Sequence, residues 1–217
     1  MINNKEDFKI KFWDYFLALE EDFTSIEKII PVDPQNTNTF SITYMKILFS
    51  ICSEIDVVFK EFIEYNQWYS FTVNDGNIGK YKDIINLNLQ DFSNEIIVFS
   101  KNIELKPFVN WKQNKKPDWW KDYNDLKHKR TLTNNGIENY KKANQKNILD
   151  ALGALYQLEM YFYKSIIDTD NVVSRLKMPV PQSKRYRIKD WIDNIDLIDN
   201  RYIIYVKEDG HLWLEGE

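Results

Sequence analysis

A histidine set among cations is the feature of this sequence best suited to chemistry. His128 lies in the stretch YNDLKHKR, flanked by Lys127, Lys129 and Arg130, and Asn124 precedes it by one helical turn. Neighbouring cations favour the neutral form of an imidazole, which then acts as a base near neutral pH. Lysine and arginine bind phosphate and stabilise the extra charge of a phosphorane-like transition state. The set suits metal-independent cleavage of RNA, with His128 as general acid or base and the 2′-hydroxyl as internal nucleophile.

A basic, solvated helix end explains the same residues equally well. The whole chain has a net charge of −4, so it is no polycation for nucleic acid. The stretch 111–130, however, holds seven Lys or Arg against three Asp, a net charge of +4. A local basic stretch inside an acidic chain is typical of a place where an anion binds.

Other kinds of site find little support. The second histidine, His211, follows a hairpin turn, where we expect a structural, exposed residue. The single cysteine, Cys52, excludes an intramolecular disulfide and a cysteine-cluster metal site, and its place on an apolar stripe predicts a buried hydrophobic residue. The stretch DWIDNIDLIDN repeats aspartate but lacks the mixed oxygen ligands and glycine turn of a metal loop. We therefore predict no metal and no cofactor.

The elements that position His128 are expected to be helices. Apolar residues recur at spacings of three and four, which draws single stripes along helices. Two β-prone runs, EIIVFS and NIELKPF, predict a small ribbon that ends at Pro107. The fold class is therefore mainly α, an antiparallel bundle of four to five long helices with a small β ribbon. The predicted helices cover about 7–29, 40–65, 78–92 and 138–167, with another beginning near Pro117.

The end of the chain has a different character. PVPQSKRYRIK, residues 179–189, is predicted to be a linker, and RYIIYV and HLWLE around Glu208-Asp209-Gly210 predict a C-terminal hairpin. We expect that hairpin to pair with the ribbon near residue 100 or with a second subunit. The predicted organisation is a helical bundle over 1–168 and a linker plus hairpin appendage over 169–217.

Neither a membrane span nor a signal peptide is predicted. No apolar run approaches the roughly 18 residues that a span requires. The N-terminal stretch MINNKEDFKIKF lacks the basic-then-apolar order of a signal peptide. We expect a cytoplasmic protein that has no membrane partner.

The order of the motifs resembles a known superfamily. PDWWKDYNDLKHKR, preceded by LKPFVNW and followed by NILDALGALYQLEMYF, is similar to a group of bacterial helical proteins with a Trp-Trp, Tyr-Asn and Lys-His block. The earlier stretch ICSEIDVVFK is also similar to that group. The arrangement resembles the HEPN superfamily (higher eukaryotes and prokaryotes nucleotide-binding domains), over about residues 8–168.

The resemblance implies an RNase that works as a homodimer. Many HEPN proteins cleave RNA in toxin–antitoxin, CRISPR-associated and abortive-infection systems, with two Arg-x4-6-His motifs meeting in one cleft. His128 matches the motif histidine, and Asn124 matches the polar residue that commonly follows the arginine. Tyr123 stands where the arginine belongs, so Lys127 or Arg130 would have to hold the scissile phosphate. An antitoxin or another defence-system protein is the implied partner besides RNA.

The resemblance also assigns supporting residues. Glu54 and Asp56 match acidic positions of the similar group and are expected to face His128 and fix its tautomer. Trp119 and Trp120 begin the motif helix, where adjacent side chains point about 100° apart. One tryptophan is thus expected in the core or a dimer interface, and the other is free to stack on a base.

Two functions of different classes remain open. The first is a metal-independent endoribonuclease of phage defence or of a toxin–antitoxin system, with His128 at its centre. The second is a catalytically inactive module that binds a nucleotide, RNA or a partner protein. The basic stretch favours the first, whereas Tyr123 and the acidic net charge favour the second.

Overall fold

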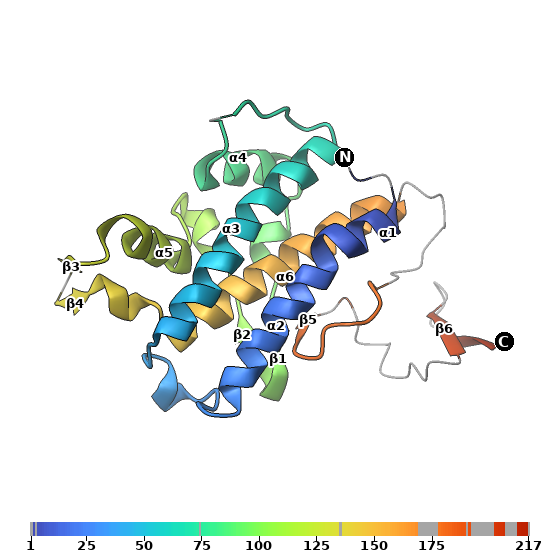
Figure 1. Ribbon diagram of the computed structural model, residues 1–217. Coiled ribbons are helices and arrows are strands. Elements are labelled where there is room, and N and C mark those ends of the chain that lie inside the picture. The colour runs from blue at the N-terminus through green and yellow to red at the C-terminus, as the bar shows by residue number, and fades with distance from the viewer. Residues whose placement is uncertain are drawn as a thin grey trace.

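The protein is mainly α, as predicted. The computed structural model describes residues 2, 4–73, 75–134, 136–168, 178–189, 191, 202–206 and 212–216. Three long helical segments lie side by side, a small antiparallel sheet packs against them, and a short helix with a two-residue ribbon forms one end of the molecule (Figure 1). No helix in these ranges is long and apolar enough to cross a membrane.

The first long segment joins two α-helices through a π-helical turn. α1 spans Lys5–Phe8, the π turn spans Lys9–Trp13 and α2 spans Asp14–Glu27. The Asn4 side chain accepts hydrogen bonds from the backbone N–H groups of Glu6 (3.0 Å) and Asp7 (2.9 Å), which satisfies two donors that the first turn leaves free. A short 3₁₀ turn, Pro34–Asn36, lies in the loop that follows α2.

α3, Ile42–Tyr65, is the second long helix. The Ser41 hydroxyl caps it by accepting from the Tyr44 N–H at 3.0 Å. Cys52 is fully buried on its apolar stripe, and burial raises the pKa of the thiol well above its ordinary value, so the residue packs as the sequence predicted. α4, Ile78–Asn88, is shorter and packs beside α3.

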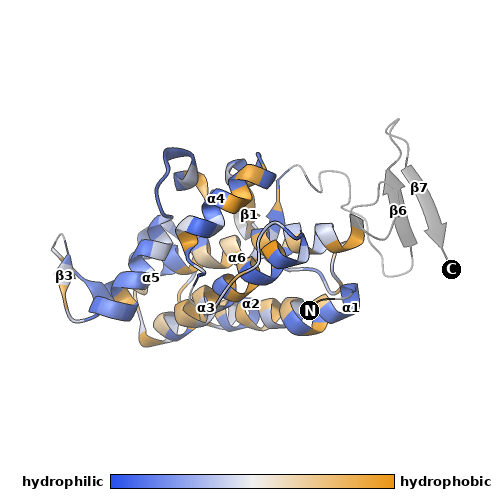
Figure 2. Cartoon of the chain, turned by 90° about the horizontal axis from the view of Figure 1, so that it is seen from above, coloured by the Kyte–Doolittle hydropathy of each residue, from blue (hydrophilic) through white to orange (hydrophobic). Residues whose placement is uncertain are grey.

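The basic stretch lies on α5. This helix spans Asp118–Lys129 and begins directly after Pro117, the residue from which the sequence predicted its start. A short ribbon of two paired strands follows, β3 (Thr133–Asn134) and β4 (Ile137–Glu138), and then a 3₁₀ turn, Asn139–Lys142. α5 and the ribbon form the end of the molecule that is hydrophilic in Figure 2.

α6, Gln145–Asp168, is the central helix. Every side chain from Ala151 to Tyr163 is buried, because α1, α2, α3, α5 and the sheet all pack against it. Aromatic rings fill much of the contact: Phe162 meets Phe8 at 5.5 Å and Phe62 at 5.5 Å between ring centroids. The sequence predicts that this helix begins earlier, at about 138. Instead, Asn139–Lys142 forms a 3₁₀ turn that packs against α5.

The prediction that 179–189 is a linker is wrong. Tyr186–Ile188 form β5, which pairs antiparallel with β1 (Ile97–Phe99), and β1 pairs on its other edge with β2 (Ile103–Leu105). Tyr186 and Ile188 are 3% and 1% exposed. Alternating apolar residues in YRI complete the small sheet on the helices, so this part of the chain belongs to the helical body. The sheet has the strand order β2-β1-β5, and short 3₁₀ turns, Phe92–Asn94, Ser100–Asn102 and Val109–Gln113, lie around it in the chain.

A buried glutamate holds this returning segment. Glu20 on α2 is 4% exposed and accepts hydrogen bonds from the Ser183 hydroxyl and from the N–H groups of Lys184 (3.2 Å) and Arg185 (3.3 Å). The Trp13 indole N–H adds a bond to the Pro181 carbonyl at 2.7 Å. These contacts satisfy a buried carboxylate and fix the approach to β5.

The predicted C-terminal hairpin is confirmed. β6, Tyr202–Val206, pairs antiparallel with β7, Leu212–Gly216. The expected pairing with the ribbon near residue 100 is not formed in the described residues, because β5 occupies that edge of β1. The repeated aspartates of 190–199 and His211 lie outside the described residues.

Replacing Glu20 should release the returning segment. Glu20→Ala removes the acceptor of the Ser183 hydroxyl and of the Lys184 N–H, while the Arg185 N–H keeps its bond to Ser183 Oγ at 3.2 Å. We therefore expect the free energy of unfolding to fall by about 2 kcal/mol in urea titrations. Trypsin should also cut faster at Arg185 and Arg187. Asp22→Ala on the same helix is the control: Asp22 is exposed, and no contact of the described residues involves it. Equal stability of the two variants would contradict the assigned role.

Candidate functional site

One face of α5 is buried in the body. Trp119, Trp120, Tyr123 and Leu126 are between 0% and 8% exposed, and the Trp119 indole N–H donates to the Pro107 carbonyl at 2.9 Å. Both tryptophans therefore lie in the core, in edge-to-face contact at 5.7 Å. The expectation that one of them is free to stack on a base is wrong, because α3, α6 and the 107–113 segment cover both indole rings.

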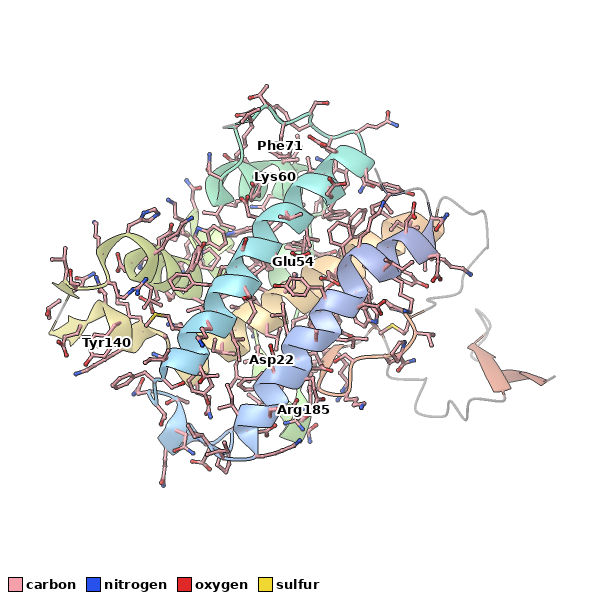
Figure 3. All side chains as sticks on the ribbon, viewed as in Figure 1. Asp22, Glu54, Lys60, Phe71, Tyr140 and Arg185 are labelled. Carbon is pink, nitrogen blue, oxygen red and sulfur yellow. The ribbon has the colours of Figure 1, made fainter. Side chains whose placement is uncertain are left out.

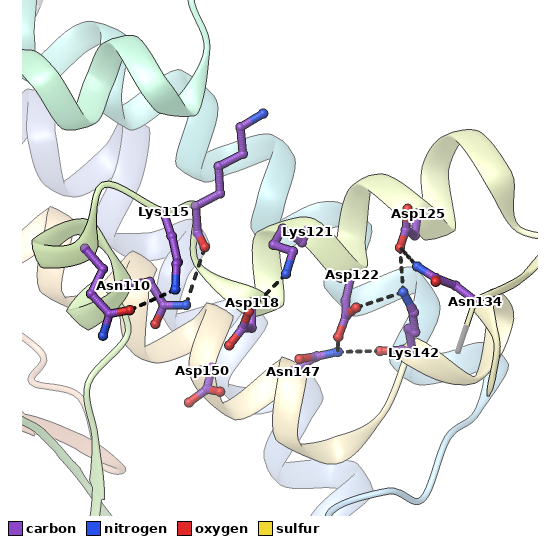
Figure 4. Close-up of polar contacts among 12 residues, drawn as sticks. Asn110, Lys115, Asp118, Lys121, Asp122, Asp125, Asn134, Lys142, Asn147 and Asp150 are labelled. Carbon is purple, nitrogen blue, oxygen red and sulfur yellow. Dashed lines mark hydrogen bonds and ion pairs between the residues drawn. The ribbon is translucent and has the colours of Figure 1, made fainter. Parts of the chain in front are cut away.

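A second face of α5 carries its acidic residues, which bind a lysine. Lys142 Nζ lies 3.0 Å from Asp122 Oδ1 and 2.5 Å from Asp125 Oδ2, and Asn147 Nδ2 donates to Asp122 at 2.9 Å (Figure 4). The hydrogen bond from Lys142 lowers the pKa of Asp125 below its ordinary value. This cluster joins α5 to the start of α6 and consumes the two carboxylates nearest to the basic residues.

The C-terminal end of α5 is left strongly basic. Lys127, His128, Lys129 and Arg130 are all exposed and line one open depression with Thr131 and Leu132. No carboxylate in the described part of the chain lies within ion-pair distance of these four side chains. The negative end of the helix dipole stabilises such cations, so the cluster fits its place on the helix as well as it fits an anion.

Aromatic rings support two of the cations. Arg130 lies over Phe49 of α3, with 5.8 Å from Cζ to the ring centroid, and Lys127 Nζ lies 5.6 Å from the centroid of Tyr123. Phe49 and Tyr123 meet edge to face at 5.7 Å. The Asn139 side chain caps the end of α5 by donating to the Lys129 carbonyl at 2.8 Å. The end of α5 is thus held by the Asn139 hydrogen bond to its backbone and by the aromatic rings that pack beneath its cations.

The Tyr-Asn pair is engaged within the protein: Tyr123 is buried in the core, and the Asn124 amide bonds to its own helix. Tyr123 is 7% exposed, and burial raises the pKa of its hydroxyl to about 12, so the residue is neutral at ordinary pH. Asn124 donates its amide N–H to the Trp120 carbonyl at 2.8 Å. Tyr123 therefore offers no charge to a phosphate, and Lys127 and Arg130 supply the charge at this end of the helix.

The predicted acidic partners of His128 are placed elsewhere. Asp56 binds Lys60 Nζ at 2.5 Å and accepts from the Tyr81 hydroxyl at 2.6 Å. Glu54 lies near the middle of α3 (Figure 3), where its charge acts on Glu159 of α6. Within the described residues, no hydrogen bond or ion pair joins Glu54 or Asp56 to His128. The structure therefore gives no support to the expectation that these carboxylates fix the tautomer of His128.

Sequence reasoning missed Phe49 and Glu159. Phe49 is a partly buried residue of α3 outside the predicted apolar stripe, and nothing in its spacing indicates that it lies beneath Arg130. Glu159 did leave a signal, since it is a lone acid in the apolar run YQLEMYF of a helix that is buried on all sides. An acid at such a position is expected to have a partner or to be neutral.

Comparison with known proteins adds no relative. No protein-family model matches the chain, and neither a curated protein nor a solved structure matches it.

Removing Lys142 should destabilise α5. Lys142→Ala leaves Asp122 and Asp125 half-buried without a counter-ion, and we expect the free energy of unfolding at pH 7 to fall by about 1–2 kcal/mol. Lowering of the Asp125 pKa stabilises the fold above the ordinary aspartate pKa, and that stabilisation is lost as the pH falls through the folded-state value. The gap between variant and wild type should therefore close in acid.

Lys141→Ala is the matched control for that comparison. Lys141 is the preceding residue, and its ion pair with Glu138 is exposed. Urea titrations at neutral and acid pH should show little change in this variant. A loss in Lys141→Ala equal to that in Lys142→Ala would show that the contacts of Lys142 are not what holds α5.

Proposed function

We propose that this protein is a HEPN-like, metal-independent endoribonuclease that acts on RNA as a homodimer, in phage defence or in a toxin–antitoxin system. One observation carries the proposal: the only exposed imidazole in the described residues lies among three cations that form no ion pair with a carboxylate of those residues. Such a surface attracts phosphate and holds a base within reach of it.

The chemistry follows from the residues of the depression. Lys127 and Arg130 bind the scissile phosphate and stabilise the charge that grows on it. His128 takes the proton of the 2′-hydroxyl, the 2′-oxygen attacks phosphorus, and the bond to the 5′-oxygen breaks. The leaving oxygen needs a proton, which His128 of the second copy supplies in a dimer. The products are a 2′,3′-cyclic phosphate and a 5′-hydroxyl.

The second candidate is a catalytically inactive module that binds RNA, a nucleotide or a partner protein. A specific observation favours it: Tyr123, which replaces the motif arginine, is a neutral core residue. The Asn124 amide N–H is also engaged with the backbone of its own helix. This candidate keeps the basic depression as an anion-binding surface and assigns no proton transfer to His128.

Expression of wild type and His128→Ala in a bacterial host separates the two candidates. The endoribonuclease predicts growth arrest with RNA fragments that end in 2′,3′-cyclic phosphate, both lost in the variant, because acid–base catalysis contributes about 10²–10⁴-fold. Cleavage by purified protein should persist in EDTA. Fragments that are formed equally by His128→Ala would refute His128 as the catalyst, and intact RNA with soluble wild type would favour the inactive module.

RNA affinity should depend on salt through Arg130. For a single-stranded RNA, the slope of log K against log salt is expected to shrink by about 0.7 in Arg130→Ala, because each phosphate contact releases counterions. Lys121→Ala is the control, since Lys121 lies at the other end of α5 and pairs with Asp118. Fluorescence anisotropy at several salt concentrations measures both slopes. Identical slopes in wild type and Arg130→Ala would exclude Arg130 as a phosphate contact.

A further inference from the structure

Glu159 is a buried acid without a partner. Its side chain is 0% exposed, and within the described residues neither carboxylate oxygen accepts or donates a hydrogen bond. An ionised carboxylate in such surroundings costs several kcal/mol, and native proteins avoid it by pairing the charge or by keeping the group protonated.

A second acid lies on the helix that packs along α6. Glu54 is half-buried near the middle of α3 (Figure 3), and α3 packs along α6. The charge of Glu54 disfavours ionisation of Glu159. No lysine, arginine or histidine of the described residues contributes to the ionisation of either carboxyl. Two acids on packed helices whose charges oppose each other do not both ionise readily when no cation pairs with them, so a proton has to take the place of the missing counter-ion.

We propose that Glu54 and Glu159 form a proton-binding site between α3 and α6, so that the protein folds with a proton on this pair and loses stability when rising pH removes it. The inference is independent of the proposed function, because it uses no residue of the basic depression.

The ionisation behaviour of both acids agrees with the geometry. Burial raises the pKa of Glu54 to about 7, and burial followed by the charge of Glu54 raises the pKa of Glu159 well above its ordinary value. In the unfolded chain a glutamate titrates near pH 4.3. Stabilisation by the bound proton is therefore complete below about pH 4 and is lost progressively as the pH rises through 7.

Glu20 shows what a buried carboxylate looks like when it is partnered. It is 4% exposed, on α2, and accepts one hydroxyl and two backbone N–H groups. Glu20 and Glu159 can thus be compared within one core, because hydrogen-bond donors surround the Glu20 carboxyl and no donor of the described residues bonds to the Glu159 carboxyl. Replacing each by glutamine asks whether the carboxyl is used as an acceptor of hydrogen bonds or as a carrier of a proton.

Urea unfolding between about pH 5 and pH 8 tests the proposal. Because burial also raises the pKa of Asp150, the quantity to compare is the difference between variants. For each proton bound on folding, the folding equilibrium constant falls about tenfold per pH unit in this range. Glu159→Gln should exceed wild type only slightly at pH 5 and by a large factor at pH 8, with a slope smaller by about one proton. Glu20→Gln should lose stability at both pH values and keep the wild-type slope.

Glu54→Gln and the double variant measure the sharing of the proton. The two substitutions should be non-additive at pH 8 and additive at pH 5, where both acids are neutral in wild type. A protonated-carboxyl infrared band near neutral pH should be present in wild type and absent in Glu159→Gln. Parallel stability curves for wild type and Glu159→Gln, or a Glu159→Gln variant less stable than wild type at pH 8, would overturn the proposal.

Discussion

The enclosure of α6 is the constraint on which the rest of the structure depends. Because side chains from 151 to 163 are buried in every direction, each polar group on this helix has to be satisfied inside the protein. Gln157 meets the Phe92 carbonyl at 2.6 Å, and Gln145 meets the Pro31 carbonyl at 3.1 Å. These contacts tie the loops before α3 and before the sheet to the central helix. Within the described residues, the Tyr156 hydroxyl, the Gln157 amide oxygen and the Glu159 carboxyl have no hydrogen-bond partner. Glu159 is the acid among these three, and the missing donor around it is what makes a bound proton the physical solution.

The same enclosure sorts the charges of α5. One face of that helix has to bury its aromatic rings against α3 and α6, so its charged residues are confined to the remaining surface. Asp122 and Asp125 fall beside Lys142, whereas Lys127, His128 and Arg130 fall at the free end. The depression at the end of α5 is therefore lined by three cations and His128, with no acid among its lining residues. This separation of charge, more than the count of lysines, is what favours an anionic ligand.

Much of the fold could be predicted from periodicity, and much of the site could not. The stripes of α2, α3 and α6 and the start of α5 at Pro117 are local signals, and the structure confirms them. The sequence predicts a linker at Tyr186 and Ile188, because a three-residue strand between basic residues carries no signal of its own until β1 is placed beside it. The burial of Trp120 likewise depends on the elements that pack around α5, so it cannot be predicted from the pattern of one helix. The contact of Arg130 with Phe49 joins residues 81 positions apart and leaves no trace in spacing.

The return of the chain to the sheet also sets the order in which the protein can be completed during synthesis. Glu20 is made early, yet its hydrogen-bond donors lie 163 to 165 positions later, and the β5 partners of β1 lie 87 to 91 positions after the residues that they pair with. Until those residues leave the ribosome, the Glu20 carboxylate of α2 has none of its hydrogen-bond donors, and the edge of β1 that pairs with β5 is open beside an apolar core. Final closure of the body is therefore a late, long-range event, and a nascent chain that ends near residue 168 is the form most exposed to misassembly.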